Sequence, residues 1–152
     1  MSTVDVLTSI SIKAPAKVVA DYACNPDNAP AWYENINSVK WKTPKPLRIG
    51  SQFGFEAKFL GKRLNYTYEI IELTDRKLVM RTAEGPFPMQ TTYTFESQNS
   101  DTTVMTLRNN GTLSGFSKLL APLIRLMMRK ANQKDLKKIK FILERSVEGK
   151  GR

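Results

Sequence analysis

The chain has 152 residues, 41% of them hydrophobic, and its 24 basic and 14 acidic side chains give a formal net charge of +10. A chain of this length removes roughly 68–70% of its extended surface from water, so we expect one domain over residues 1–152 with a full core. Histidine is absent and cysteine occurs once, which excludes Ser/His and Cys/His nucleophilic systems, an internal disulfide and histidine-ligated metals; we expect neither metal nor cofactor.

The N-terminal segment predicts a strand followed by two short helices. Apolar and polar residues alternate over residues 4–12, as in a strand with one apolar face. A short helix is predicted over residues 14–24, ended by Asn25 and Pro26, and a second one runs from Pro30 to Tyr33. The start of the chain lacks the features of a secretory signal, and no apolar stretch approaches the ~20 residues of a membrane span, which predicts a cytoplasmic protein.

Residues 36–112 predict six strands of an antiparallel sheet with one apolar face. Turn signals such as "TPKPLRIG" and "EGPFP" divide the segment, and apolar and polar side chains alternate within the strands. In "SQFGFEAKFLG" the aromatic side chains share one face, while Gln52, Glu56 and Lys58 share the other. This pattern is typical of a sheet that is covered on one side.

The closing segment predicts the cover of that sheet, a long helix over most of residues 114–147. It contains strong helix formers, and its apolar residues recur at helical spacing. At 1.5 Å per residue the helix is expected to be roughly 45–50 Å long. Because proline removes a backbone hydrogen bond, we expect Pro122 to bend or divide the helix near its first turns.

The order of one strand, two short helices, six strands and a long helix resembles the START-like, or Bet v 1-like, helix-grip fold. The sequence resembles the polyketide cyclase/dehydrase branch of that superfamily (SRPBCC) in residues 11–41, 48–73 and 76–97 and in the closing helix. The resemblance implies an α+β fold: a curved antiparallel seven-stranded sheet wrapped around the C-terminal helix, with two short helices after strand 1 and a cavity between sheet and helix. The superfamily mixes lipid carriers, receptors, cyclases and chaperone activators, so the fold alone does not settle the activity.

On this resemblance the apolar faces of the strands and of the long helix would line a ligand cavity. A mostly aromatic lining with a few hydroxyls suits a flat or greasy molecule held by shape and one or two hydrogen bonds. The alternative is that the rings fill the space themselves, and Trp32 either seals the core or acts as a lid over a ligand. The predicted ligand-binding residues are Trp32, Phe53, Phe55, Phe59, Tyr66, Tyr68, Met80, Tyr93, Phe95, Leu120, Ile124 and Met127.

Arg81 and Arg108 are the candidate polar anchors, because each lies in a strand where two alternations compete. An inward arginine would be a buried charge that needs a carboxylate from the protein or the ligand. The outward placement is the favoured one. No pair of carboxylates stands out for acid/base chemistry, so no catalytic residue is predicted.

Three functions follow as hypotheses. The leading one is binding, transport or sequestration of a hydrophobic small molecule or lipid. The second is a cyclase- or dehydrase-like enzyme, in which Tyr66, Tyr93 or an inward arginine polarises a carbonyl of an aromatic or polyketide-like substrate. Nucleic-acid binding through the basic C-terminal helix is the least favoured, since that helix lacks interleaved basic and aromatic residues.

The start of the closing helix suggests a further partner. Residues 119–130 are apolar on more than one face, and Met127 and Met128 lie beside basic residues. Such a segment would suit a gate that contacts an anionic membrane surface during ligand exchange, whereas the simpler alternative is that it packs on the sheet.

Overall fold

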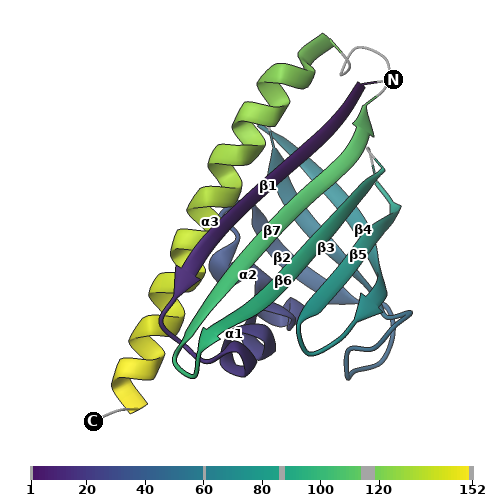
Figure 1. Cartoon of the computed structure of the whole chain (residues 1–152). Helices are drawn as coiled ribbons and strands as arrows, with labels where there is room; N and C mark the ends of the chain where they lie inside the picture. The colour runs from purple at the N-terminus through teal and green to yellow at the C-terminus, as the bar shows by residue number, and fades with distance from the viewer. Residues whose placement is uncertain (1, 60, 86–87, 114–118, 151–152) are drawn as a thin grey trace.

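The computed structural model describes residues 2–59, 61–85, 88–113 and 119–150. Its elements follow the predicted order, with helices between the first and second strands and at the C-terminal end (Figure 1). The elements are β1 (Ser2–Ile12), α1 (Ala16–Ala23), the 3-10 turn η1 (Pro26–Asn28), α2 (Ala29–Trp32), β2 (Ile36–Trp41), β3 (Gln52–Phe59), β4 (Lys62–Leu73), β5 (Lys77–Glu84), β6 (Met89–Asn99), β7 (Thr102–Leu113) and α3 (Ala121–Lys150).

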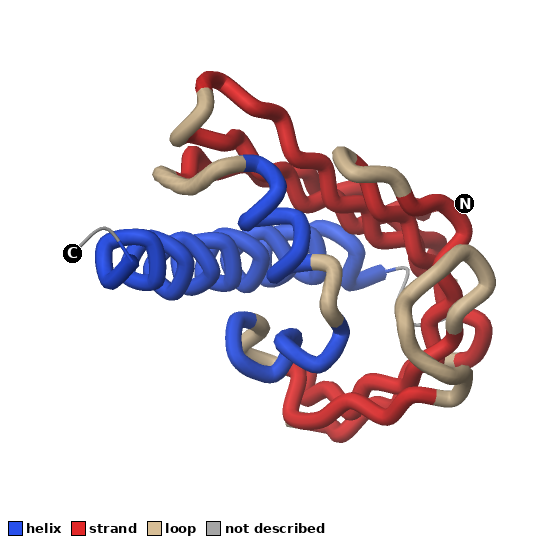
Figure 2. Tube along the Cα trace, turned by 90° about the horizontal axis from the view of Figure 1, so that it is seen from below, coloured by secondary structure: helices blue, strands red, loops and turns tan. Residues whose placement is uncertain are grey.

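All seven strands form one antiparallel sheet in the order β1-β7-β6-β5-β4-β3-β2. Figure 2 shows the sheet curved into a hollow, with α3 running through the hollow and the short helices at one end of it. The expected architecture, a curved sheet around a long C-terminal helix with two short helices after the first strand, is confirmed. None of the helices in the described part of the chain combines the length and the apolar character needed to cross a membrane.

Alternation along each strand decides which side chains enter the hollow. In β7 the buried residues are Thr103, Met105, Leu107, Asn109 and Leu113, while Arg108 is exposed. A register slip of one residue would exchange these two faces, so the burial of Met105 and Leu107 fixes the direction of their neighbours. This resolves the two competing alternations of β7 and brings an asparagine, rather than an arginine, to the inner face.

The long helix covers most of the predicted range of residues 114–147. Residues 114–118, where its start was expected, lie outside the described residues, and α3 begins at Ala121. Pro122 therefore lies in the first turn, where backbone N–H groups have no partner within the helix. α3 runs undivided past Pro122, and the turns predicted over residues 114–118 lie outside the described residues, so a bend or division there stays a prediction.

The apolar packing between α3 and the sheet occurs in two separate clusters. The main cluster joins α1, α2 and the sheet to the later turns of α3 at Leu136, Ile139 and Leu143. The small cluster joins the first turns of α3, at Ala121 and Ile124, to three residues on β1 and β7: Val4, Val6 and Leu113. Between Ile124 and Leu136 no residue of α3 belongs to the buried apolar part of either cluster, and the side chains of Met128, Ala131, Asn132 and Asp135 line a cavity there.

Candidate functional site

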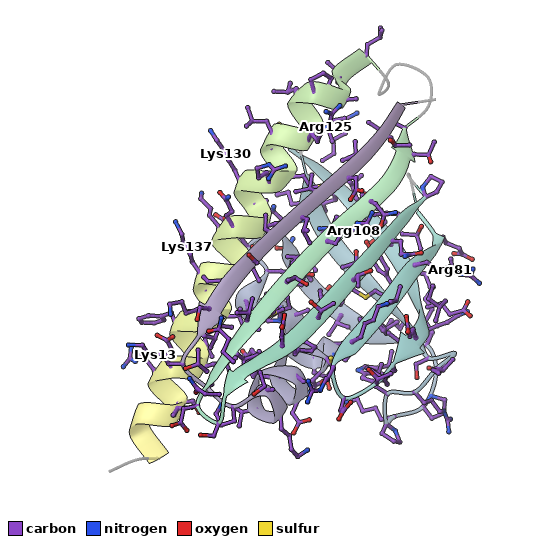
Figure 3. All side chains as sticks on the ribbon, viewed as in Figure 1. Lys13, Arg81, Arg108, Arg125, Lys130 and Lys137 are labelled. Atoms are coloured by element: carbon purple, nitrogen blue, oxygen red, sulfur yellow. The ribbon has the colours of Figure 1, made fainter. Side chains whose placement is uncertain are left out.

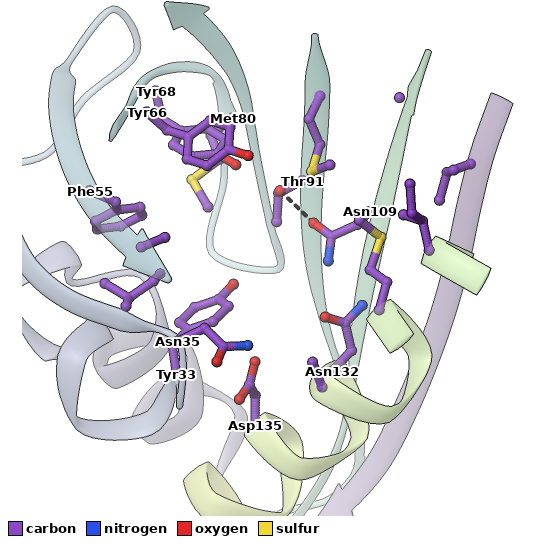
Figure 4. A pocket seen from close by; sticks show the side chains of 18 of the residues that line it. Tyr33, Asn35, Phe55, Tyr66, Tyr68, Met80, Thr91, Asn109, Asn132 and Asp135 are labelled. Atoms are coloured by element: carbon purple, nitrogen blue, oxygen red, sulfur yellow. Dashed lines mark hydrogen bonds between the residues drawn. The ribbon is translucent and has the colours of Figure 1, made fainter. Parts of the chain in front are cut away.

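A cavity of about 150 Å³ lies between α3 and the concave face of the sheet. It receives side chains from the strands on both sides of the hollow, from the turn after α2 and from the middle of α3 (Figure 4). The residues of its wall that matter below are Tyr33, Asn35, Phe55, Tyr66, Tyr68, Met80, Thr91, Asn109, Ile124, Met128, Ala131, Asn132 and Asp135.

One side of the cavity is aromatic and apolar. Phe55 on β3 and the neighbouring Tyr66 and Tyr68 on β4 stack along the wall, with ring centroids 5.7 Å apart for Phe55 and Tyr68 and 6.0 Å apart for the two tyrosines. Met80 on β5 also lines the cavity, and so does Ile124 on α3, which belongs to the small cluster. The rings are tilted against one another and line the wall, which favours an apolar ligand with rings of its own.

The opposite side carries two polar side chains of α3, Asn132 and Asp135. Both are buried, with 4% and 3% of their surface exposed, although the other polar side chains described on α3 are exposed or half-buried. Asp135 Oδ1 accepts a 3.0 Å hydrogen bond from the backbone N–H of Glu34, and burial raises the pKa of its carboxyl group to about 6. The Nδ2 atom of Asn132 is buried without a hydrogen-bond partner among the described residues, so its donors remain unused.

Hydroxyl groups extend the polar side toward the sheet. The hydroxyls of Tyr33 and Tyr93 lie 2.5 Å apart, and burial raises both pKa values well above the usual range, which keeps both phenols protonated. Thr91 Oγ1 donates a 2.6 Å hydrogen bond to Asn109 Oδ1, which leaves the amide nitrogen of Asn109 directed toward the cavity (Figure 4). The polar side can therefore offer phenol and amide donors together with one titratable carboxyl group.

The chemistry available in the cavity is limited to these groups. Asp135 is the one acidic residue of the described wall, and Lys58, an exposed residue, is its one cation. Among the residues that the structure describes, no group of three acidic or cysteine side chains could hold a metal ion. A carboxyl group with a pKa of about 6 can exchange a proton near neutral pH, and a protonated phenol can donate a hydrogen bond to a carbonyl.

Five of the residues predicted from the sequence line the cavity: Phe55, Tyr66, Tyr68, Met80 and Ile124. Others belong to the packed core, because α1, α2 and the later turns of α3 fill that part of the hollow. Trp32, Phe53 and Phe95 are no more than 2% exposed, and Tyr93, at 3%, reaches the site through its hydroxyl. Leu120 packs on the small cluster, the half-buried Met127 is replaced at the wall by Met128, and the side chain of Phe59 lies outside the described residues.

The two arginines considered as polar anchors lie on the convex face of the sheet (Figure 3). Arg108 donates two hydrogen bonds, of 2.8 and 2.7 Å, to the carboxylate of Asp5 on the adjacent strand. Arg81 is exposed, since its neighbour Met80 occupies the inner face of β5. An anchoring role for either arginine inside the cavity is therefore wrong.

Sequence reasoning did not select Tyr33, Thr91, Asn109, Asn132 and Asp135 as site residues. For the two residues of α3 a usable signal exists. Asn132 and Asp135 follow Ile124 and Met128 at intervals that keep all four on one face of a 3.6-residue helix, and that face continues to Ile139. Two polar residues within a buried apolar stripe indicate a cavity or a ligand.

Comparisons with known proteins agree with this geometry. Residues 3–146 match the model of a family described as polyketide cyclase/dehydrase and lipid transport. The structure is similar to the Zhui aromatase/cyclase from Streptomyces sp. R1128, with a TM-score of 0.80 and 14% identity over 96% of each chain. It is also similar to TTHA0849 from Thermus thermophilus (TM-score 0.76, 20% identity, 93% of this chain and 98% of that one).

A START superfamily protein from Mycobacterium smegmatis is a further structural relative, with a TM-score of 0.70 and 14% identity over 95% of this chain and 97% of that one. No curated protein matches the sequence. At these identities the solved structures establish the fold alone, and they confirm the START-like resemblance.

Proposed function

The chain belongs to the family described as polyketide cyclase/dehydrase and lipid transport, and from this premise we propose that it binds a hydrophobic small molecule in the cavity between the sheet and α3. The observation that supports the proposal is the interrupted core: two apolar clusters are separated by a cavity instead of meeting. Because protein interiors are normally close-packed, an unfilled interval of this size is favoured where a ligand completes the packing.

The lining specifies the kind of ligand. The aromatic rings on one side favour an apolar body, and the unused amide donors of Asn132 favour a hydrogen-bond acceptor such as a carbonyl or ether oxygen. A cavity of this size is of the order that holds a single small ring, so a compact ring compound fits better than a whole phospholipid. The ligand class that we propose is therefore a hydrophobic ring compound with one acceptor group.

A ligand panel tests this proposal directly. Native mass spectrometry and thermal shift would compare aromatic ketones with the matching hydrocarbons, fatty acids and phospholipids. We expect the ketones to raise the melting temperature most. A protein that carries none of these compounds and gains no stability from any of them would contradict the proposal.

A cavity-filling variant separates binding inside the hollow from binding at the surface. Ala131 lines the cavity, whereas Gln133, on the same helix, is exposed. Ala131→Leu should fill part of the volume and weaken ligand binding at least tenfold, while Gln133→Leu should leave it unchanged. Arg81→Gln and Arg108→Gln should also leave ligand binding unchanged, because both arginines lie outside the hollow.

A second candidate function, a cyclase- or dehydrase-like activity, is supported by the pairing of Asp135 with protonated tyrosines in one cavity. A carboxyl group whose pKa is about 6 can accept a proton next to a carbonyl and return it, while the hydroxyl of Tyr33 polarises the carbonyl oxygen. No hydrogen bond joins Asp135 to Tyr33 in the described residues, where the Tyr33 hydroxyl is paired with Tyr93. A ligand would have to connect the two groups.

Turnover of poly-ketone substrates distinguishes the two functions. If the protein is an enzyme, a cyclised or dehydrated product should form, and Asp135→Asn should abolish turnover while the protein still binds the substrate. Binding without turnover by the unmodified protein would leave the carrier function in place and exclude this activity for the substrates tried.

A further inference from the structure

The face of α3 that points away from the sheet begins with three exposed leucines. Leu119, Leu123 and Leu126 are 76%, 50% and 53% exposed, respectively. Leu119 lies just before α3, and Leu123 and Leu126 lie in its first two turns, three residues apart and so on one side of the helix; we call the three the leucine stripe. Isolated apolar side chains on a surface need no explanation, but three exposed leucines within eight residues at one end of a helix favour an interaction site.

The same face continues as a basic surface. Lys130 and Lys137 follow the leucine stripe at helical spacing, and Figure 3 shows both pointing away from the sheet. Between residues 119 and 143 the sequence has seven basic residues and one acidic residue, and that acidic residue, Asp135, is buried at the cavity. Lys134 pairs with Glu34 and Lys140 with Glu144, whereas Lys130 and Lys137 form no ion pair among the described residues. The outward face of this part of α3 is therefore apolar at its start and carries unpaired positive charge beyond.

We infer that this face of α3 docks on an anionic lipid bilayer, with the leucine stripe in the hydrocarbon boundary and Lys130 and Lys137 at the phosphate groups. Leucine side chains gain free energy by leaving water for the bilayer, and lysines near an anionic surface add electrostatic attraction. A nucleic acid would be held by the lysines but would leave the leucines in water. A second copy of the chain would bring the unpaired Lys130 and Lys137 of one face close to those of the other, which opposes self-association.

The docking surface lies directly behind the cavity. Ile124, Met128 and Ala131 line the cavity from the opposite face of the same turns of α3. This step rests on the proposed function: if the cavity holds hydrophobic molecules, docking would place it next to the lipid bilayer in which such molecules dissolve. The partner of the site is then a bilayer that supplies or receives the ligand.

Vesicle flotation with the unloaded protein tests docking without reference to the ligand. Vesicles of phosphatidylcholine alone are compared with vesicles of equal parts phosphatidylcholine and phosphatidylglycerol, each at low and high salt. We expect the protein to float with the anionic vesicles at low salt, to stay unbound with the neutral ones, and to be released by salt. Failure to bind anionic vesicles overturns docking, whereas failure in the ligand panel without vesicles overturns the proposed function, so the two failures are distinct.

Matched variants locate the surface. Leu123→Ser with Leu126→Ser should weaken vesicle binding at least about tenfold, whereas Leu7→Ser, which removes a leucine that is 57% exposed on β1, should leave it unchanged. Lys130→Gln with Lys137→Gln should weaken it on the order of 25-fold, compared with no change for Lys40→Gln with Arg81→Gln on the strands. Thermal melts of every variant check that folding is intact.

Three outcomes would overturn the inference. The leucine variants could bind anionic vesicles as tightly as the unmodified protein. Light scattering could show a dimer that the leucine variants dissociate, which would assign the stripe to a second copy. Finally, a DNA fragment could compete with vesicles equally well for the unmodified protein and the leucine variants, which would assign the basic face to nucleic acid.

Discussion

The carboxylate of Asp135 accepts a 3.0 Å hydrogen bond from the backbone N–H of Glu34, which joins the middle of α3 to the turn after α2. This bond fixes the carboxylate at the wall of the cavity. Burial raises the pKa of Asp135, and the bond opposes that shift only in part. A buried carboxyl group that titrates near neutral pH is costly for stability, so its position favours a role toward a ligand.

The pH dependence of stability should show this cost. The pKa of Asp135 is about 6 in the folded protein, against a reference value of 3.8. The folded protein therefore binds a proton more tightly than the unfolded chain. This contribution to stability is fully present below pH 3.8 and is lost as the pH rises through 6. Asp135→Asn keeps an oxygen for the Glu34 N–H. It should be more stable than the unmodified protein at about pH 8, by up to about 3 kcal/mol, with no such gain at about pH 4.

Urea unfolding at the two pH values measures the change in the free energy of unfolding. Asp27→Asn is the control, because the pKa of Asp27 is lowered and the opposite pH dependence is expected. Hydrogen bonds from Lys45 and Trp41 lower the pKa of Asp27, so its carboxylate supports folding at high pH. Removing it should destabilise the protein at about pH 8 and have little effect well below the ordinary aspartate pKa. If Asp135→Asn behaves like Asp27→Asn, Asp135 is not a destabilising group in the folded protein.

The unused amide of Asn132 leads to a second prediction. A buried donor without a partner costs about 1–3 kcal/mol, so Asn132→Ala should leave the unloaded protein as stable as before or more stable. The same variant replaces a side chain of the cavity wall with a smaller one, so a loss of ligand affinity cannot come from steric obstruction of the cavity. We expect affinity to fall at least fivefold for an aromatic ketone and to change little for the matching hydrocarbon.

Calorimetry of the two ligands against the unmodified protein and Asn132→Ala measures this difference. Gln133→Ala is the control, because it makes the same truncation at the next, exposed position of α3. Equal losses of affinity for ketone and hydrocarbon would show that Asn132 shapes the cavity without bonding the ligand.

The tyrosine pair predicts a third result. Tyr93 is 3% exposed and its hydroxyl meets that of Tyr33, so Tyr33→Phe leaves a buried hydroxyl without its partner. Each single change to phenylalanine should therefore destabilise the protein by about 1–3 kcal/mol, and the double change should cost less than the sum. A double-mutant cycle by urea unfolding measures the coupling. Costs that simply add would mean that the two hydroxyls do not stabilise one another.

The fold could be predicted from the sequence because period and chain order specify it. Alternation over β3, β4 and β6 identifies the inner faces, and the repeat of apolar residues in α3 identifies the cover. The faces of β5 and β7 could not be assigned, since apolar residues occupy both alternations there. The face is decided by packing in the folded sheet. Arg108 of β7 pairs with Leu7 of β1, and both side chains lie on the side of the sheet that faces water.

The site was harder to predict, because alternation gives the face of a residue but not its depth along the hollow. Phe53 and Phe55 share one face of β3 and both belong to the main cluster, yet only Phe55 lines the cavity. The difference comes from where the short helices and α3 approach the sheet, which is a matter of tertiary packing. Asn132 and Asp135 are the exception, since helical spacing alone places them among buried residues.

Trp32 separates the solid part of the hollow from the cavity. Its ring is fully buried, 4.1 Å from the ring of Tyr33 and 5.6 Å from that of Tyr93. Trp32→Ala should therefore destabilise the unloaded protein by about 3–5 kcal/mol, as for a large core truncation. Trp41→Ala should cost less, because Trp41 is only partly buried and bonds Asp27 at the surface.

Trp32→Phe refines the test, because it keeps an aromatic ring and removes an indole N–H that has no partner among the described residues. Its cost should be well below that of Trp32→Ala, since most of the packing is retained. Urea unfolding of the three variants, without ligand, measures these costs. If Trp32→Ala left the free energy of unfolding unchanged and altered only ligand uptake, Trp32 would be a lid over the cavity; the complete burial of its ring instead predicts a seal that must stay in place for the chain to fold.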